Sequence, residues 1–371
     1  MGAPGALRGL RLVCGLVLMA FVAGHLANLA LGVRSLATME MARPWLMGPW
    51  RSTPGIALLV GAALIHLFLG LYALGTRRSA AMTKTDIVQL CLGLVTPPLL
   101  LNHAFVMHLA GEVSPGFDAT FGQALAIYWS FSPHYAFQQL AVVLVVWMHA
   151  AIGLYSWLVL KPVWRRVGGL VLPVLFALPI LALLGFAEAG KEALALLEGD
   201  AAWKARLVEN ITKVVKVTAT YEALQRQLLV AYGLLVLLAA AFFAGRILHA
   251  RSRRYTVHYD GNLKAEARYG LTVLEYSLLN DVPHAHVCSG RGRCGTCRVR
   301  VTSGADQLSP PQDDEKSTLA RHGAGSDERL ACQARVRGPG VEVIRVLPAY
   351  VDAAASRSPE DWAVASEAAP R

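Results

Sequence analysis

Charged side chains are scarce in this sequence of 371 residues, because Asp, Glu, Lys and Arg together make up only 16% of it. Cysteine is scarcer still, with six residues in the whole chain. No serine–histidine–acid arrangement or phosphate-binding loop stands out, so nothing indicates nucleophilic catalysis or phosphoryl transfer. Hydrophobic residues, in contrast, make up 55% of the chain, and most charges fall outside long apolar runs. These proportions predict a membrane protein.

Six apolar runs are long enough to cross a lipid bilayer, which needs about 20 such residues. The first run follows Arg8 and Arg11, as in a secretory signal peptide, but it continues past about 20 residues and contains His25 and Asn28. We therefore expect a retained helix rather than a cleaved signal. The six runs are Leu10–Leu31, Pro54–Leu74, Ile87–Leu109, Phe137–Leu160, Gly169–Phe186 and Leu228–Ile247.

Lysine and arginine are distributed unevenly between the two sides of this membrane region. One side has none from Glu112 to Phe137, although its first loop carries three arginines and its amphipathic, helix-like segment 188–227 mixes six basic with six acidic residues. The other side should be cytoplasmic, together with both termini, in a bacterial inner membrane. This topology explains the net charge of +10 without a nucleic-acid partner. The basic residues of the cytoplasmic side are Arg8, Arg11, Arg77, Arg78, Lys84, Lys161, Arg165, Arg166, Arg251, Arg253 and Arg254.

Four cysteines in the last third of the chain form the pattern C-x5-C-x2-C-x34-C. Three thiolates within ten residues and a fourth from a distant loop are typical of a [2Fe–2S] cluster held by four cysteines. A zinc site also takes four cysteines, but usually as two close pairs, whereas these divide three and one. A reducing cytoplasm disfavours disulfides. The predicted ligands are Cys288, Cys294, Cys297 and Cys332.

The residues around these cysteines alternate as strands do, and turns separate them. The expected elements are a strand at 255–259, a hairpin turn at 260–262, a return strand at 264–269, a helix capped by Thr272, and strands at 297–301 and 341–346. This order and the cysteine pattern resemble the ferredoxin family, in its adrenodoxin-like branch. The resemblance implies an α+β domain of the β-grasp type that binds a [2Fe–2S] cluster.

Gly290, Gly292 and Gly295 in the cysteine loop spell GxGxxG, the fingerprint of dinucleotide binding. That motif needs a helix after it, whereas a strand follows here, and cysteines lie inside and beside the motif. We expect these glycines to let backbone amides approach the cluster, where hydrogen bonds to its sulfurs raise the reduction potential. Four arginines in and after the loop would recruit an acidic partner, raise the potential further, or simply form a solvated face.

Histidines occur on each of the first four apolar runs. A lone histidine inside a membrane is usually a polar residue hydrogen-bonded between helices, but one on each of four consecutive helices favours b-type haem, which needs axial imidazoles from facing helices. At a rise of about 1.5 Å per residue, His25 and His103 lie about 9 Å from the outer ends of their helices. His66 and His149 lie about 18 Å from the outer face.

These matched depths predict two bis-histidine b haems. His25 and His103 would hold an outer haem, and His66 and His149 an inner one. His108 is five residues after His103 and lies elsewhere around the helix, so the two cannot both bind one iron. His108 is therefore an alternative to His103 as a ligand, or it lies near a quinone or a haem carboxylate.

The stretch from Arg11 to Gly32, with Gly24-His25-Leu-Ala-Asn28 inside it, and the histidine on each helix resemble the membrane anchors of succinate dehydrogenase and fumarate reductase. This resemblance implies one or two bis-histidine b haems beside a quinone site. The additional ferredoxin domain is similar to the N-terminal part of membrane-bound bacterial class III adenylate cyclases. However, only 23 residues follow Pro348, and we expect them to be a disordered tail rather than a cyclase domain.

The sequence therefore predicts a membrane all-α six-helix bundle that binds haem b (1–250), a basic linker (251–254), a β-grasp ferredoxin domain (255–348) and the tail (349–371). We expect electron transfer between a quinone or external donor, the haems, the cluster and a cytoplasmic redox partner, with the cofactors carrying the chemistry. The alternatives are a redox sensor that signals to a separate effector, and an anchor without haem. Arg51 is a candidate for binding a haem carboxylate at the outer face.

Overall fold

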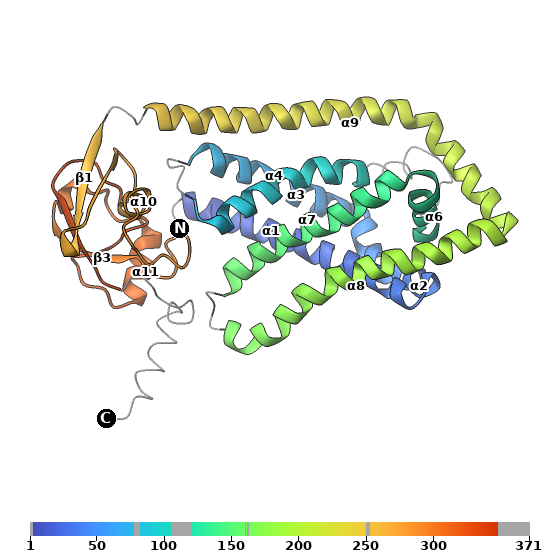
Figure 1. Ribbon diagram of the computed structural model, residues 1–371, viewed down its shortest axis with the longest axis horizontal. Coiled ribbons are helices and arrows are strands. Elements are labelled where there is room, and N and C mark those ends of the chain that lie inside the picture. Colours follow the sequence, from blue (N-terminus) through green and yellow to red (C-terminus); the bar gives the residue numbers. More distant parts are fainter. Residues whose placement is uncertain are drawn as a thin grey trace.

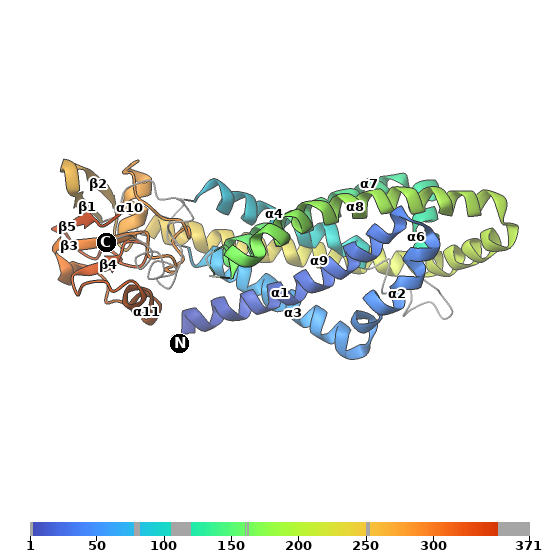
Figure 2. The ribbon, with the colours of Figure 1, turned by 90° about the horizontal axis from the view of Figure 1, so that it is seen from below.

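The computed structural model describes residues 3–77, 82–104, 120–159, 161, 163–249 and 253–347. Long helices run side by side along one axis, and a small sheet with its own helices lies at one end of them (Figure 1 and Figure 2). The first helix begins and the last long helix ends at this same end of the bundle. The predicted fold class, a helical bundle followed by an α+β domain, is therefore confirmed.

Six helices among the described residues are long and apolar enough to cross a membrane, which indicates a multi-pass membrane protein. They correspond to the six predicted apolar runs, although residues 105–109 of the third run lie outside the described residues. The six are α1 (Ala3–Ala30), α3 (Thr53–Gly75), α4 (Lys84–Ala104), α7 (Pro133–Leu158), α8 (Trp164–Gly199) and α9 (Ala201–His249).

Shorter elements connect the long helices at the end remote from the sheet (Figure 1). The 3-10 turn η1 (Leu31–Val33) and helix α2 (Leu36–Arg51) join α1 to α3, while α6 (Phe121–Ala126) and the π-helical turn η3 (Ile127–Phe131) precede α7. Asn28 is fully buried and donates a hydrogen bond to the Met39 carbonyl at 2.7 Å. This bond fixes the return of α2 against α1.

Small residues set the distances between helices in the bundle. Gly185 on α8 lies so close to α1 that a Cβ there would be 1.9 Å from the carbonyl oxygen of Leu29. Helix α1 also packs against α3, and α4 packs against α7. Large apolar side chains such as Leu170 (74% exposed) and Phe176 (71% exposed) point outward, as residues that face lipid do.

The C-terminal domain is built on a five-stranded mixed sheet with the order β2-β1-β5-β3-β4. β1 pairs antiparallel with β2 and parallel with β5. β1 begins one residue earlier than predicted, because Arg254, which was assigned to the linker, pairs with Arg268. The strands are β1 (Arg254–Tyr259), β2 (Lys264–Arg268), β3 (Arg298–Ser303), β4 (Glu328–Leu330) and β5 (Val341–Arg345).

Two helices complete this domain, α10 (Val273–Leu279) and α11 (Asp313–Arg321), with 3-10 turns η5 (Asp260–Asn262) and η6 (Ala305–Gln307). α10 begins at the predicted cap. The Thr272 hydroxyl accepts a hydrogen bond from the Glu275 amide at 3.2 Å, and the Glu275 carboxylate accepts one from the Thr272 amide at 2.7 Å. This capping box fixes the start of a helix whose Tyr276 is fully buried in the domain core.

Polar contacts join the domain to the end of the bundle. Arg8 on α1 forms an ion pair with Asp314 on α11, and Arg291 in the cysteine loop lies 3.6 Å from Asp86 on α4. The guanidinium of Arg268 also donates to the carbonyl of Ile247, near the end of α9, at 2.8 Å. The cysteine loop therefore lies against the helix ends at which α1 and α4 begin.

Candidate functional site

The four predicted cluster cysteines are buried together at the edge of the domain core, with exposures of 2–6%. Their thiols form two hydrogen-bonded pairs, Cys288 with Cys294 and Cys297 with Cys332. A binuclear cluster with four cysteine ligands takes two on each iron, so this two-and-two arrangement suits it. Among the described residues, no group of three or more His, Cys, Asp or Glu side chains is placed to hold a single metal ion.

Cys288 lies in the most polar part of this site. The Cys294 thiol and the backbone amides of Arg293, Cys294 and Arg291 form hydrogen bonds to its sulfur and hold its pKa at about 5, against the opposite effect of burial. The thiolate is the form that binds metal, and the same amides are available to a cluster. The loop therefore stabilises negative charge where the predicted ligands meet.

The three predicted glycines of the loop have a left-handed backbone. At Gly295, φ is 66°, and a Cβ would lie 2.1 Å from the imidazole Nε2 of His322. Gly290 and Gly292 have φ of 80° and 68°. Only glycine suits this backbone without strain, and at Gly295 only glycine also leaves room for the neighbouring ring.

Side chains outside the loop hold it in place. Thr318 on α11 donates to the carbonyl of Gly292 at 2.6 Å, and the Gln333 amide donates to the carbonyl of Gly290 at 3.1 Å. Glu315 is fully buried and accepts hydrogen bonds from the Arg329 guanidinium and from the Leu330 amide, two residues before Cys332. The sequence patterns gave no sign of these supports because they come from distant positions.

The four predicted haem histidines come together in two pairs inside the bundle. The ring centres of His25 on α1 and His103 on α4 are 5.8 Å apart. Those of His66 on α3 and His149 on α7 are 6.2 Å apart. The first pair is flanked by Phe121, which stacks on His25 at 6.2 Å. These are the two pairs that the depth argument had grouped.

The inner pair, His66 and His149, has a matched set of backbone partners. His66 Nδ1 lies 3.0 Å from the carbonyl oxygen of Arg11 on α1, and His149 Nδ1 lies 3.1 Å from that of Gln89 on α4. Four residues after each of these carbonyls stands a glycine. A Cβ at Gly15 would lie 3.0 Å from the His66 ring, and one at Gly93 would lie 2.8 Å from the His149 ring.

The two helix pairs that carry these histidines repeat in sequence. G-L-V-x7-H occurs in α1 from Gly15 to His25 and in α4 from Gly93 to His103. H-x3-G-L-Y occurs in α3 from His66 and in α7 from His149. Equivalent histidines of the two repeats thus face each other, as two-fold pseudo-symmetry requires. This repeat was visible in the sequence, but the prediction of the histidine pairs did not use it.

Two further predicted residues are placed differently. His108 lies outside the described residues, so its assignment as an alternative ligand stays a prediction. Arg51 is exposed at the C-terminal end of α2. It follows Trp50, which contacts Phe21, and Phe21 in turn stacks on His25. The side chains of Trp50 and Phe21 therefore lie between Arg51 and the outer histidine pair.

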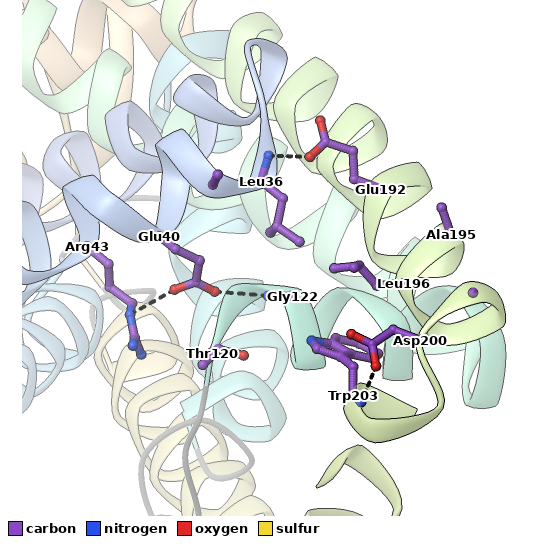
Figure 3. A pocket seen from close by; sticks show the side chains of 12 residues that line it. Leu36, Glu40, Arg43, Thr120, Gly122, Glu192, Ala195, Leu196, Asp200 and Trp203 are labelled. Carbon is purple, nitrogen blue, oxygen red and sulfur yellow. Dashed lines mark hydrogen bonds and ion pairs between the residues drawn. The ribbon is translucent and has the colours of Figure 1, made fainter. Parts of the chain in front are cut away.

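A cavity of about 880 Å³ is lined by residues of α2, α6, α8 and α9 (Figure 3), and α2 and α6 lie at the end of the bundle remote from the sheet (Figure 1). Each carboxylate in the lining of the cavity accepts a hydrogen bond from a backbone amide in the first turn of a helix. These carboxylates therefore have a structural role. These bonds join Glu40 to Gly122, Glu192 to Leu36, and Asp200 to Trp203. The neutral and basic part of its lining includes Arg43, Thr120 and Trp203. Phe121, between two lining residues, separates the cavity from His25.

Comparisons with known proteins locate a family in the C-terminal domain. Residues 257–337 match the family described as 2Fe-2S iron-sulfur cluster binding domain. The chain is 34% identical over 88 residues to 2Fe-2S ferredoxin-5 of Aquifex aeolicus, covering 24% of this chain and 91% of that protein.

Longer relatives share only this portion. Chlorosome protein I of Chlorobaculum tepidum is 33% identical over 87 residues, which are 24% of this chain and 36% of that protein. A component of the Na(+)-translocating NADH-quinone reductase of Chlamydia felis is 27% identical over 81 residues, 22% of this chain and 18% of that protein. The chain thus spans only a minor part of these two relatives, and no solved structure matches it. Through residues 257–337, this chain belongs to the family of 2Fe-2S iron-sulfur cluster binding domains.

Proposed function

We propose that this protein carries electrons between two b haems in its membrane bundle and the [2Fe–2S] cluster of its C-terminal domain. A cluster-binding domain and six membrane-competent helices in one chain support electron transfer at a membrane. In this proposal Cys288, Cys294, Cys297 and Cys332 would hold the cluster, which would supply one-electron chemistry.

One observation carries the haem proposal: equivalent histidines of the two repeats face each other. Metal–imidazole bonds of about 2.0–2.1 Å place the centres of two opposed rings roughly 6 Å apart. The measured separations are 5.8 Å for the outer pair and 6.2 Å for the inner pair. The Nδ1 atoms of His25 and His103, unlike those of the inner pair, have no hydrogen-bond partner among the described residues, and the His103 ring forms a hydrogen bond with the Gln139 side chain.

The residues around the cofactors position them and exclude water. Haem iron and the cluster each accept and release single electrons when bound. A hydrogen bond from Nδ1 to the carbonyl of Arg11 or Gln89 fixes the tautomer of His66 or His149 and leaves Nε2 as the ligand atom. At the cluster, the Gln333 amide donates to the Cys332 sulfur at 3.4 Å, and the Thr296 hydroxyl lies 3.0 Å from the Cys294 sulfur.

We assign the sheet end of the bundle to the cytoplasm of a bacterium and the opposite end to the outer face. Basic side chains such as Arg8, Arg77 and Lys84 gather at the sheet end, and the cluster thiols need a reducing compartment. The cavity next to the outer pair is then the site for an electron donor or acceptor such as a quinone, because Thr120, Trp203 and Arg43, which pairs with Glu40 at 3.1 Å, place donor groups along its lining. A cytoplasmic redox protein would exchange electrons with the cluster.

The test is a spectrum of the purified full chain together with single histidine variants. We expect a low-spin haem spectrum and two haems per chain. His66→Ala and His149→Ala should each remove the same haem and leave the other, and His25→Ala and His103→Ala should remove the second. If the wild-type protein binds no haem while its cluster is intact, the bundle is an anchor only and this function is wrong.

Turnover separates electron transfer from the sensor function. The haem-loaded protein should pass electrons steadily from a quinol to a ferredoxin-type acceptor. A protein that is reduced once and then shows no turnover with any such acceptor would instead be a redox sensor.

A further inference from the structure

Four arginines lie in the region where the cysteine loop meets the start of α1. Arg8 and Arg11 come from the start of α1, and Arg291 and Arg293 come from the cysteine loop, with side chains that are all partly buried. The charge of Arg11 interacts with those of Arg291, Arg8 and Arg293, so the four side chains form one group, which we call the arginine cluster.

The arginine cluster is only partly neutralised by negative charge. Asp314 pairs with Arg8, and Asp86 lies 3.6 Å from Arg291, whereas Arg11 and Arg293 make no ion pair with any described residue. Partial burial and the charges of Arg291 and Arg8 lower the pKa of Arg293, and the charges of Cys288 and Asp314 offset this only in part. Holding unpaired cations together away from water is costly, so an arrangement of this kind fits a site that binds an anion.

The arginine cluster also has a defined neighbour in the membrane. Arg11 supplies the carbonyl that accepts the hydrogen bond from His66, and its side chain interacts electrostatically with both His66 and His149. On the other side, Arg293 interacts with the charge of Cys288. The arginine cluster therefore includes one residue whose carbonyl contacts the inner histidine pair and two residues of the loop that carries the cluster cysteines.

We propose that the arginine cluster binds the two carboxylates of the inner haem, and that haem binding thereby fixes the ferredoxin domain against the bundle. This inference rests on the proposed haem. Together with Asp86 and Asp314, the two haem carboxylates would give four acidic groups beside the four arginines. Arginine suits this role because its planar fork binds carboxylates through two hydrogen bonds. Since two of the arginines belong to the cysteine loop, the domain and the haem would stabilise each other.

The first experiment compares haem with its dimethyl ester, in which both carboxylates are blocked. The double variant Arg11→Gln/Arg293→Gln, the control Arg300→Gln and the wild type are loaded with each, and transfer to apomyoglobin is followed. Arg300 is an exposed residue of the same domain that pairs with Asp327 at 3.2 Å. The double variant should lose the inner haem about tenfold faster or more, with no such effect on the ester. Arg300→Gln should behave as the wild type.

The second experiment measures docking without reference to haem affinity. Hydrogen exchange of residues 288–297 and 313–321 is recorded in the full chain. Protection should fall in His66→Ala, which lacks the inner haem, and should stay in His25→Ala, which lacks only the outer one.

The outcomes separate the two proposals. A chain that binds no haem contradicts the proposed function itself. If haem binds but the ester and haem respond alike to the double variant, or protection is independent of His66, the inference is wrong. The same holds if release of haem and of its ester changes equally with the anionic lipid content of the vesicle, because the arginines would then bind lipid phosphate.

Discussion

Gly295 shows how a single position in the cysteine loop is restricted in two ways. Its φ of 66° disfavours any other residue, and a Cβ would collide with His322. Gly323 has a similar φ of 57° but open space around it. We expect Gly295→Ala to lower the free energy of unfolding by about 1–3 kcal/mol more than Gly323→Ala, because only the former adds a clash to the strain. Urea titration of the full chain, followed at the visible absorbance of the cluster, measures both.

Equal midpoints for the two alanine variants would contradict this account. They would mean that the His322 ring moves aside without cost.

His284 makes the stability of the same domain depend on pH. It is buried, its Nδ1 lies 2.8 Å from the Ser277 hydroxyl, and burial, with the charge of Arg345, lowers its pKa to about 4. The unfolded chain therefore binds a proton more readily than the folded one between pH 6.5 and pH 4. Stability is unaffected by this group above pH 6.5 and falls as the pH decreases through that window, by about 2 kcal/mol at pH 5.

His284→Asn is the matched variant, because it keeps a polar group for Ser277 but does not titrate. Its urea midpoint should change less than that of the wild type between pH 7 and pH 5. Parallel curves for the two proteins would show that other groups cause the acid sensitivity.

At the scale of elements, close approach of helices depends on the repeated glycines. Gly93 on α4 leaves room for the His149 ring, whereas a Cβ at Gly61 on α3 would have nothing within 4 Å. We expect Gly93→Ala to displace His149 and to reduce the inner haem content several-fold, since a Cβ would lie 2.8 Å from the ring. Gly61→Ala should leave both haems. Pyridine haemochrome quantification gives the counts, and full haem content in Gly93→Ala would contradict the proposed position of the inner haem.

The helices and strands that could be predicted from the sequence have strong local patterns of apolar residues. Apolar runs marked the six long helices, and alternation marked β1, β2, β3 and β5. Helix α2 escaped prediction because its prolines and polar residues fall short of a membrane run, although its role as a connecting helix is clear from its contacts. Strand β4 has only three residues, and α11 has nine residues that are mostly charged, so neither contains an apolar run or an alternation like those of the predicted elements.

Some features of the candidate site could likewise be predicted from the local sequence, whereas others depend on contacts between distant segments. Cysteine spacing and histidine depth grouped the residues that the structure brings together, because both depend on chain geometry alone. The carbonyl partners of His66 and His149, the buried Glu315 and the arginine cluster depend on contacts between segments far apart in sequence. Without a fold, nothing in the local pattern of Arg11 distinguishes it from the other basic residues at the side predicted to be cytoplasmic.

At the scale of the whole molecule, the position of the cluster depends on few contacts. The domain follows α9 in the chain, and the polar contacts between the described residues of the domain and of the bundle include two ion pairs and the bond from Arg268 to α9. Partly exposed ion pairs contribute little individually and are screened by salt. Docking is therefore expected to be adjustable by ionic strength, unlike the fold of either part.

Removing both interface carboxylates tests this expectation. Asp86→Asn with Asp314→Asn takes away the partners of Arg291 and Arg8 and leaves the arginines to repel one another, so the docked state should lose roughly 0.5–2 kcal/mol, or about two- to thirtyfold in population. Hydrogen exchange of α11 and of the cysteine loop in the full chain should accelerate accordingly at low salt. The wild type should approach the same rates as salt is raised, because screening removes the same attraction. Asp327→Asn, which breaks an exposed pair with Arg300 away from the interface, should have no effect on these segments. Unchanged protection in the double variant would show that apolar contacts or the α9 connection, and not charge, hold the cluster in place.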